Sequence, residues 1–174
     1  MSAPKRITRA QLRDLSQEAS RQSRLRKNLN LHPALDDPIQ RMFNAMEPGT
    51  YVRPHRHARA NGWELMLLVN GAFSILIFDP TGRVVDRVDL NAAGGSVAVE
   101  IPAHTWHSVV SLAAETVMFE VKPGPYSPVE DKDFAQWAPP ESSPDTALFV
   151  QWYANARPGD TPPEMSRNPG HAPA

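Results

Sequence analysis

The sequence has no cysteine and no long apolar run. Without cysteine, this chain of 174 residues forms no disulfides and no thiolate metal sites, which leaves histidine and carboxylate side chains as the plausible metal ligands. No apolar run approaches the roughly 20 residues of a membrane helix, and the first ten residues lack the apolar core of a signal peptide. The net charge of −1 gives no argument for nucleic acid or a membrane surface. We therefore expect a cytoplasmic protein with neither kind of partner.

The composition is that of a globular domain of ordinary size. Hydrophobic residues make up 41% of the chain and charged residues 21%, and we see no internal repeat. The chain contains 18 prolines, and they are concentrated late in the chain. We divide the chain into an N-terminal part (1–47) that packs on a barrel, a barrel core (48–122) and a proline-rich extension (123–174). We expect little fixed structure after about residue 157.

A short amphipathic helix is predicted over residues 9–22. Thr8 and Gln11 form a capping box, and Leu12, Leu15 and Ala19 fall on one face at helical spacing. The first 31 residues are basic, with only Asp14 and Glu18 opposing Lys5, Arg6, Arg9, Arg13, Arg21, Arg24, Arg26 and Lys27. This positive charge is either a solvated face or part of a lid over an anionic ligand.

Short strands dominate the middle of the chain. They are separated by Gly, Pro, Asn and Asp turns with no helix between them, and we place them at 39–46, 63–69, 72–78, 84–90, 96–101, 107–112 and 116–121. Asn70-Gly71 reads as a tight hairpin turn that would pair the strand before it with the strand after it. This pattern is typical of a mainly β fold, an antiparallel barrel or jelly roll.

Two histidines point to a metal site. His55 and His57 stand at i and i+2, so on a strand both rings face the same side. Glu64 lies on the next strand-like run, and a later segment ends at His107. Histidine nitrogens with a carboxylate are ligands of divalent first-row metals, and the sequence does not choose between zinc, iron, manganese and nickel.

The spacing of these residues resembles the two-part cupin signature. A Gly49…His55-x-His57…Glu64…Gly71 motif is followed by Pro102-x-His104-x-x-His107. This resemblance implies a small β-barrel with one metal ion bound by His55, His57, Glu64 and His107. The gap of six residues before Glu64 is longer than usual, and His104 stands where glycine is usual. Glu64 is therefore either a direct ligand or a residue that holds an imidazole N–H.

A wider set of motifs resembles the WbuC family of cupin-fold metalloproteins. The matching text covers about residues 8–141 and includes R-K-N-L-N-L-H, D-D-P-I-Q-R, E-P-G-T-Y-V-R-P-H-R-H, E-I-P-A-H-T-W-H, F-E-V-K-P-G-P-Y and F-A-Q-W-A-P-P-E. That family is associated with bacterial surface-polysaccharide gene clusters. The resemblance implies a role in surface-polysaccharide metabolism.

Further residues are candidates for contact with a substrate. Tyr51 and Arg53 share the strand parity of the two histidines, so a regular strand would aim both at the metal. We take Tyr51 as a catalytic candidate and Arg53 as a substrate-binding one. Glu120, on the last strand, is a candidate catalytic base. Three residues of an extended N-terminal segment are donors for sugar hydroxyls or a phosphate: Arg26, Asn28 and Asn30.

Three functions remain open from the sequence. The first is a metal-dependent enzyme, an isomerase, an epimerase or an oxygenase, acting on a small carbohydrate-derived or nucleotide-sugar molecule. The second is a non-catalytic module that binds or senses such a ligand through its metal. The third is a scaffold with a structural metal. A homodimer is expected in each case, since small β-barrels of this type often associate through an edge strand or an N-terminal extension.

Overall fold

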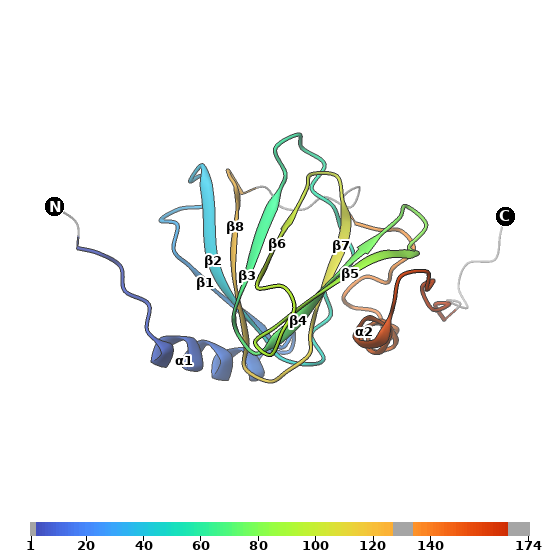
Figure 1. Cartoon of the computed structure of the whole chain (residues 1–174), viewed down its shortest axis with the longest axis horizontal. Coiled ribbons are helices and arrows are strands. Elements are labelled where there is room, and N and C mark those ends of the chain that lie inside the picture. The colour runs from blue at the N-terminus through green and yellow to red at the C-terminus, as the bar shows by residue number, and fades with distance from the viewer. Residues whose placement is uncertain (1–2, 127–133, 167–174) are drawn as a thin grey trace.

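Two antiparallel sheets and two helices make up the described part of the chain. The computed structural model describes residues 3–126 and 134–166. Along the chain the elements are α1 (Arg9–Ser20), β1 (Arg26–Asn30), β2 (Ile39–Met46), β3 (Glu64–Asn70), β4 (Ala72–Phe78), β5 (Val84–Asn91), β6 (Ala98–Ile101), β7 (Trp106–Ser111), β8 (Thr116–Pro123) and α2 (Thr146–Asn155) (Figure 1). The strands expected from the sequence are present with ends shifted by at most two residues, and the mainly β fold class is confirmed.

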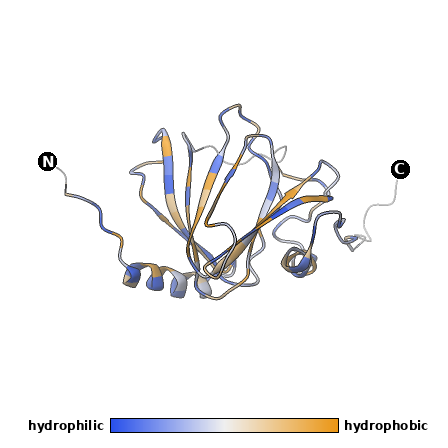
Figure 2. Cartoon of the chain, viewed as in Figure 1, coloured by the Kyte–Doolittle hydropathy of each residue, from blue (hydrophilic) through white to orange (hydrophobic). Residues whose placement is uncertain are grey.

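The strands divide into a five-stranded sheet, in the order β1-β2-β8-β3-β6, and a three-stranded sheet, in the order β5-β4-β7. Apolar side chains from the facing sides of both sheets form the main core, which comprises Met46, Met66, Phe73, Ile75, Leu90, Ile101, Val109 and Met118. Alternation along each strand sends these residues inward and their neighbours outward. Figure 2 shows the resulting mixture of hydrophobic and hydrophilic residues along the strands.

The N-terminal helix covers the outer face of the five-stranded sheet. The predicted capping box is present, with the Thr8 hydroxyl accepting from the Gln11 backbone N–H and the Gln11 side chain accepting from the Thr8 N–H. The apolar face of α1 packs through Leu15 and Ala19 against Ala45 and Val117. The helix predicted over 9–22 is thus confirmed, and it ends at Ser20.

The second helix covers the outer face of the three-stranded sheet. Phe149 and Tyr153 of α2 pack on Leu76, Phe78 and Val84 in a cluster separate from the main core. Both helices therefore lie outside the sheets, as Figure 1 shows. Within the described ranges, neither helix is long and apolar enough to cross a membrane.

The chain after α2 is fastened to β5. The backbone N–H of Val84 donates to the Asp160 carbonyl, and that of Gly159 donates to the Val84 carbonyl. Residues 157–166 contain no helix or strand, but these bonds fix their course across the edge of the three-stranded sheet. The expectation of little fixed structure after residue 157 also covers residues 167–174, which lie outside the described residues, and there it stays a prediction.

The hairpin predicted at Asn70-Gly71 is wrong. β3 pairs with β6 and β8, whereas β4 pairs with β5 and β7, so Gly71 carries the chain from one sheet to the other. The register of β3 shifts by a bulge between Leu68 and Asn70, just before this crossing. Gly71 adopts a φ of +78°, a left-handed conformation that glycine reaches without steric cost.

We predict that Gly71→Ala lowers the free energy of unfolding by more than the backbone strain of a positive φ alone would. A methyl group at residue 71 would come within 2.5 Å of the Thr116 hydroxyl and 2.7 Å of its Cα. Gly159 is the matched control, since its φ is +102° and nothing lies within 4 Å of the added Cβ. Gly159→Ala should cost about 1–2 kcal/mol of unfolding free energy and Gly71→Ala clearly more, measured by urea denaturation. Equal losses in the two variants would contradict the close approach to Thr116.

Candidate metal centre

Three histidines and one glutamate converge at one end of the space between the sheets. One ligand atom from each of His55, His57, Glu64 and His107 can be chosen so that all four lie within 4.8 Å of one another. Glu64 is the first residue of β3 and His107 the second residue of β7, so the two come from different sheets. His55 joins them because its backbone exchanges two hydrogen bonds with that of His107, at 3.0 and 2.9 Å.

Backbone carbonyls fix the orientation of two of the rings. His55 Nδ1 lies 3.0 Å from the Arg53 carbonyl oxygen, and His107 Nδ1 lies 2.9 Å from the Thr105 carbonyl oxygen. A carbonyl accepts but does not donate, so each Nδ1 carries a proton, and His55 presents the lone pair of its Nε2. This is the arrangement in which a second partner holds a metal-binding imidazole in one tautomer.

The distances around Glu64 fit a shared cation. Glu64 Oε2 lies 3.0 Å from His107 Nε2, and Glu64 Oε1 lies 2.9 Å from His57 Nε2. The His57 contact is not aligned as a hydrogen bond, so this buried nitrogen has no such partner among the described residues. Ligand atoms about 2.1 Å from one metal ion lie about 3 Å apart at right angles, so the spacing matches the donor set of a divalent metal.

Burial sets the charges of the cluster. Desolvation, with the neighbouring His107 ring, lowers the pKa of His55 to about 3, so its imidazole is neutral and able to bind a metal. Burial alone would raise the pKa of Glu64. The Lys122 ammonium and the two adjacent imidazoles outweigh that effect and hold it well below its usual value. The cluster therefore presents the neutral His55 imidazole and one ionised carboxylate.

A buried lysine links the cluster to a second carboxylate. Lys122 Nζ lies 2.8 Å from Glu64 Oε1 and 2.6 Å from Glu120 Oε1. Asn44 Nδ2 donates to Glu120 Oε2 at 2.6 Å. Burial raises the pKa of Glu120 in spite of the lysine, and the two carboxylates raise the pKa of Lys122 against its own desolvation. The candidate base Glu120 thus lies next to the metal ligands, one lysine away.

Sequence reasoning missed Lys122. Its signal was present, because Lys122 follows Glu120 by two residues, so the two side chains share the inner face of β8. The cross-strand register places Glu120 opposite Met66, two residues after Glu64 on β3. That register depends on long-range pairing, which the local sequence does not specify.

Tyr51 lies away from the cluster. Its hydroxyl donates to the Pro139 carbonyl oxygen at 2.7 Å, and its ring stacks on Tyr153 with centroids 6.0 Å apart. The expected strand parity does not hold here, because residues 50–54 form no strand and only His55 makes a bridge. Tyr51 packs instead in the cluster beneath α2.

Arg53 lies beside the segment that crosses His55. Its Nη2 donates to the Ala135 carbonyl oxygen at 3.0 Å, and its guanidinium lies 5.1 Å from the centroid of the Phe134 ring. Phe134 itself forms an isolated bridge with His55. Arg53 is therefore near the cluster but is engaged with the chain that covers it.

The three N-terminal candidates divide into two kinds. Arg26 forms an ion pair of 2.6 Å with Glu141 and donates to the Tyr51 carbonyl oxygen, so its donors are occupied. Asn28 and Asn30 are exposed on β1. Asn28 lies opposite Asn44 in the strand register, on the same side of the sheet. The two asparagines therefore extend the polar row of Asn44 and Glu120 toward the edge of the sheet.

Comparisons with known proteins give one family model and a set of distantly similar solved structures. The family model that matches, over residues 7–90, is described as a domain of unknown function (DUF6016). No curated protein matches the chain. KdgF from Halomonas sp. is a similar solved structure, with 20% identity, coverage of 62% of this chain and 83% of that one, and a TM-score of 0.44.

Two further solved structures are similar to the chain at a comparable level. A cupin superfamily protein from Desulfitobacterium hafniense has 18% identity, coverage of 56% and 76%, and a TM-score of 0.44. A conserved protein of unknown function from Streptococcus pyogenes has 17% identity, coverage of 73% and 98%, and a TM-score of 0.48. Cupin superfamily proteins are thus among the structures that the chain is similar to. The WbuC resemblance stays a prediction.

We predict that the purified protein carries about one divalent metal ion per chain and that this ion depends on the cluster. His55→Ala and His107→Ala should each lower metal affinity by more than about 100-fold, because each removes a donor nitrogen. Elemental analysis and titration after chelation measure this. His104→Asn is the matched control, since His104 is exposed, lies outside the cluster and has a φ of +65° that asparagine tolerates. Metal retained by both alanine variants would contradict the site.

We predict that Lys122→Met destabilises the metal-free protein by roughly 3–5 kcal/mol at neutral pH, because it leaves two buried carboxylates without their cation. In the native chain the depressed pKa of Glu64 stabilises the fold above its ordinary pKa of 4.5, and this contribution is lost as the pH falls further. The Lys122→Met variant lacks the stabilisation of Glu64 by the lysine at every pH. At low pH, protonation of Glu64 and Glu120 relieves the repulsion between their carboxylates. The difference should therefore shrink toward pH 4.

Chemical denaturation at a series of pH values, with chelator present, measures this difference. Lys27→Met is the matched control, because Lys27 pairs with Glu18 at 3.5 Å on the exposed surface. It should change the free energy of unfolding by less than about 0.5 kcal/mol. A Lys122→Met protein as stable as this control would show that the lysine is not needed to hold the two carboxylates.

Proposed function

We propose that the chain is a metal-dependent cupin enzyme that isomerises or epimerises a small carbohydrate-derived molecule, such as a nucleotide sugar. One observation carries this proposal. A row of polar groups runs from the cluster through Lys122, Glu120 and Asn44 to the exposed Asn28 on the same face of the five-stranded sheet. A structural metal alone would need no such row.

The four ligands would hold zinc, iron, manganese or nickel. When bound, such an ion polarises a carbonyl or hydroxyl oxygen of the substrate. The chain's own residues supply the remaining functions. Asn28 and Asn30 present amide donors and acceptors to sugar hydroxyls at the open edge, and Lys122 offers an ammonium to an oxygen that becomes negative.

Glu120 is the proposed catalytic base. Burial raises the pKa of Glu120, which makes its carboxylate a stronger base than an exposed one. In an isomerisation, a C–H bond next to the substrate carbonyl breaks, the proton passes to Glu120, and the electron pair enters the enolate. Glu120, whose proton exchanges in part with solvent, then delivers a proton to the former carbonyl carbon. The hydroxyl proton moves to the former carbonyl oxygen, which leaves the new carbonyl on the neighbouring carbon. No oxidant is consumed, so this chemistry is complete with the groups named here.

A second function is favoured by the contacts of Glu120 itself. Both of its oxygens are engaged, one by Lys122 and the other by Asn44, each at 2.6 Å. A carboxylate held in this way also suits fixed recognition of a hydroxyl group. The alternative is therefore a metal-dependent module that binds or senses the same ligand without changing it.

The cellular setting follows from the sequence resemblance. Similarity to the WbuC family supports a role in surface-polysaccharide metabolism, with the protein acting as a cytoplasmic homodimer. This setting is part of the proposal and is independent of the catalytic role of Glu120.

We predict that Glu120→Gln retains binding of the substrate but lowers its turnover by about 10²–10⁴-fold, the usual contribution of a general base. A panel of nucleotide sugars is incubated with metal-loaded protein in D₂O, and NMR detects both product and exchange of a carbon-bound proton. Glu100→Gln is the matched control, because Glu100 is an exposed carboxylate on β6. Metal-dependent binding with neither exchange nor product would favour the non-catalytic module instead.

A further inference from the structure

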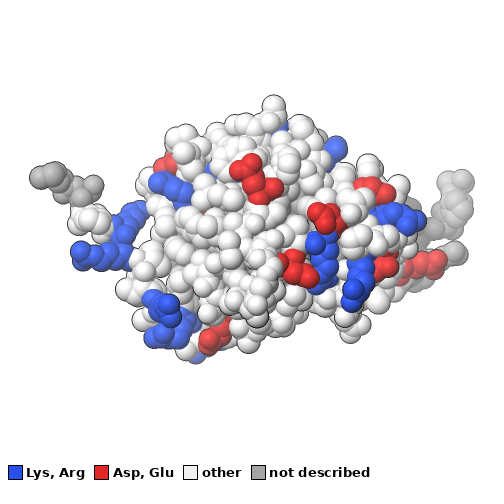
Figure 3. Space-filling model, viewed as in Figure 1, with Lys and Arg blue, Asp and Glu red and all other residues white. Residues whose placement is uncertain are grey.

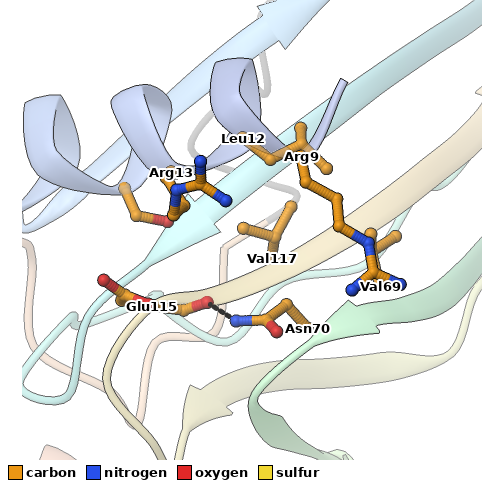
Figure 4. A pocket seen from close by; sticks show the side chains of 8 residues that line it. Arg9, Leu12, Arg13, Val69, Asn70, Glu115 and Val117 are labelled. Atoms are coloured by element: carbon orange, nitrogen blue, oxygen red, sulfur yellow. Dashed lines mark hydrogen bonds between the residues drawn. The ribbon is translucent and has the colours of Figure 1, made fainter. Parts of the chain in front are cut away.

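A cavity lies between α1 and the outer face of the five-stranded sheet. It encloses about 400 Å³, a volume suited to a small molecule. The cavity is lined by residues of α1, of the end of β3 and of the start of β8: Arg9, Leu12, Arg13, Ser16, Val69, Asn70, Glu115 and Val117 (Figure 4). We call it the helix cavity.

The helix cavity is separate from the metal centre. Val69 follows Glu64 by five residues, which is about 16 Å along β3. The alternation of the strand sends the two side chains to opposite faces. Val117 packs on the outer face with α1, while its neighbour Met118 lies in the main core. A molecule in the helix cavity therefore does not touch the four metal ligands.

The cavity carries an excess of positive charge. Arg9 and Arg13 stand at i and i+4 on one face of α1, and among the described residues neither guanidinium forms an ion pair or hydrogen bond. Figure 4 shows Arg9 extending from α1 to Val69. Glu115 is the single acid in the lining, against two arginines. Basic side chains also gather at the α1 side of the face drawn in Figure 3.

A buried hydroxyl in the lining lacks a partner. Ser16 is only 2% exposed, and its Oγ makes no hydrogen bond among the described residues. A buried hydroxyl normally finds a hydrogen-bond partner, which in mid-helix is often the carbonyl four residues before it. Leu12, Val69 and Val117 add apolar surface beside this hydroxyl. The cavity thus combines unpaired cations, a free hydroxyl and an apolar wall.

We propose that the helix cavity binds a small organic oxyanion, one carboxylate or phosphate group on a short apolar chain. The oxyanion accepts from the guanidinium groups of Arg9 and Arg13 and from the Ser16 hydroxyl. Its apolar chain lies on Leu12, Val69 and Val117. Asn70 lies at the rim, where its Nδ2 donates to the Glu115 carbonyl oxygen. Part of the basic N-terminal segment thereby gains a role in anion binding.

The test is a titration of the whole protein with hexanoate, hexyl phosphate and the neutral hexanamide, followed by calorimetry and by methyl NMR. At least one of the two anions should bind and shift the methyl signals of Leu12, Val69 and Val117, while hexanamide should not. The double variant Arg9→Gln with Arg13→Gln should weaken binding at least tenfold, and Ser16→Ala should weaken it by a smaller factor. Arg21→Gln is the matched control, since Arg21 caps the same helix outside the cavity.

Each other outcome overturns the proposal. Binding of neither anion, or an equal loss in Arg21→Gln, would mean that the cavity is not an oxyanion site. Ultracentrifugation of the same samples detects a dimer that the double variant dissociates, which would assign the cavity to a second copy of the chain. The titration is repeated with chelator, where binding should be unchanged. This result separates the helix cavity from the metal-dependent function proposed above.

Discussion

Burial of one carboxylate among three imidazoles is the constraint on which this structure depends. Glu64 cannot stay ionised in a poorly solvated interior unless positive charge lies close to it. Lys122 supplies that charge from the neighbouring strand, and a divalent ion would supply more from the centre of the cluster. Lys122 in turn draws Glu120 and Asn44 into the same network. The polar interior is therefore one electrostatic unit, in which each member is retained by the charge of another.

The architecture leaves room for this unit by placing both helices outside the sheets. α1 and α2 each bury an outer face with their own small cluster, so the main core lies between the sheets. Methionine and branched aliphatic residues fill one part of that space, and the polar row occupies the other. The change of sheet at Gly71 is essential to this division, because it sends β3 and β4 to opposite walls and brings Glu64 and His107 to face each other.

The sequence predicted the local features well and the long-range ones less well. The Thr8 cap and the strand positions follow from short motifs with a physical basis, whereas the convergence of the histidines with Glu64 was implied by the resemblance to the cupin signature. The prediction of a hairpin at Asn70-Gly71 was wrong because the same dipeptide occurs both in hairpin turns and where the chain crosses between sheets. The prediction that Tyr51 faces the metal was wrong because side chains alternate in this way only on a regular strand, and the segment around Tyr51 forms none. The role of Lys122 was not predicted because its partner Glu64 lies on another strand, and the local sequence does not specify how distant strands pair.

The strand edges of the three-stranded sheet carry a further consequence. Its β5 edge is hydrogen-bonded by Gly159 and Asp160. Its β7 edge is hydrogen-bonded by His55, which is also one of the four candidate metal ligands. Unpaired edges invite strand addition and aggregation, and covered ones resist it. Self-association by strand addition is thereby directed to β1 or β6, the outer strands of the five-stranded sheet. The segment that holds His55 in the cluster of candidate ligands thus also covers the β7 edge.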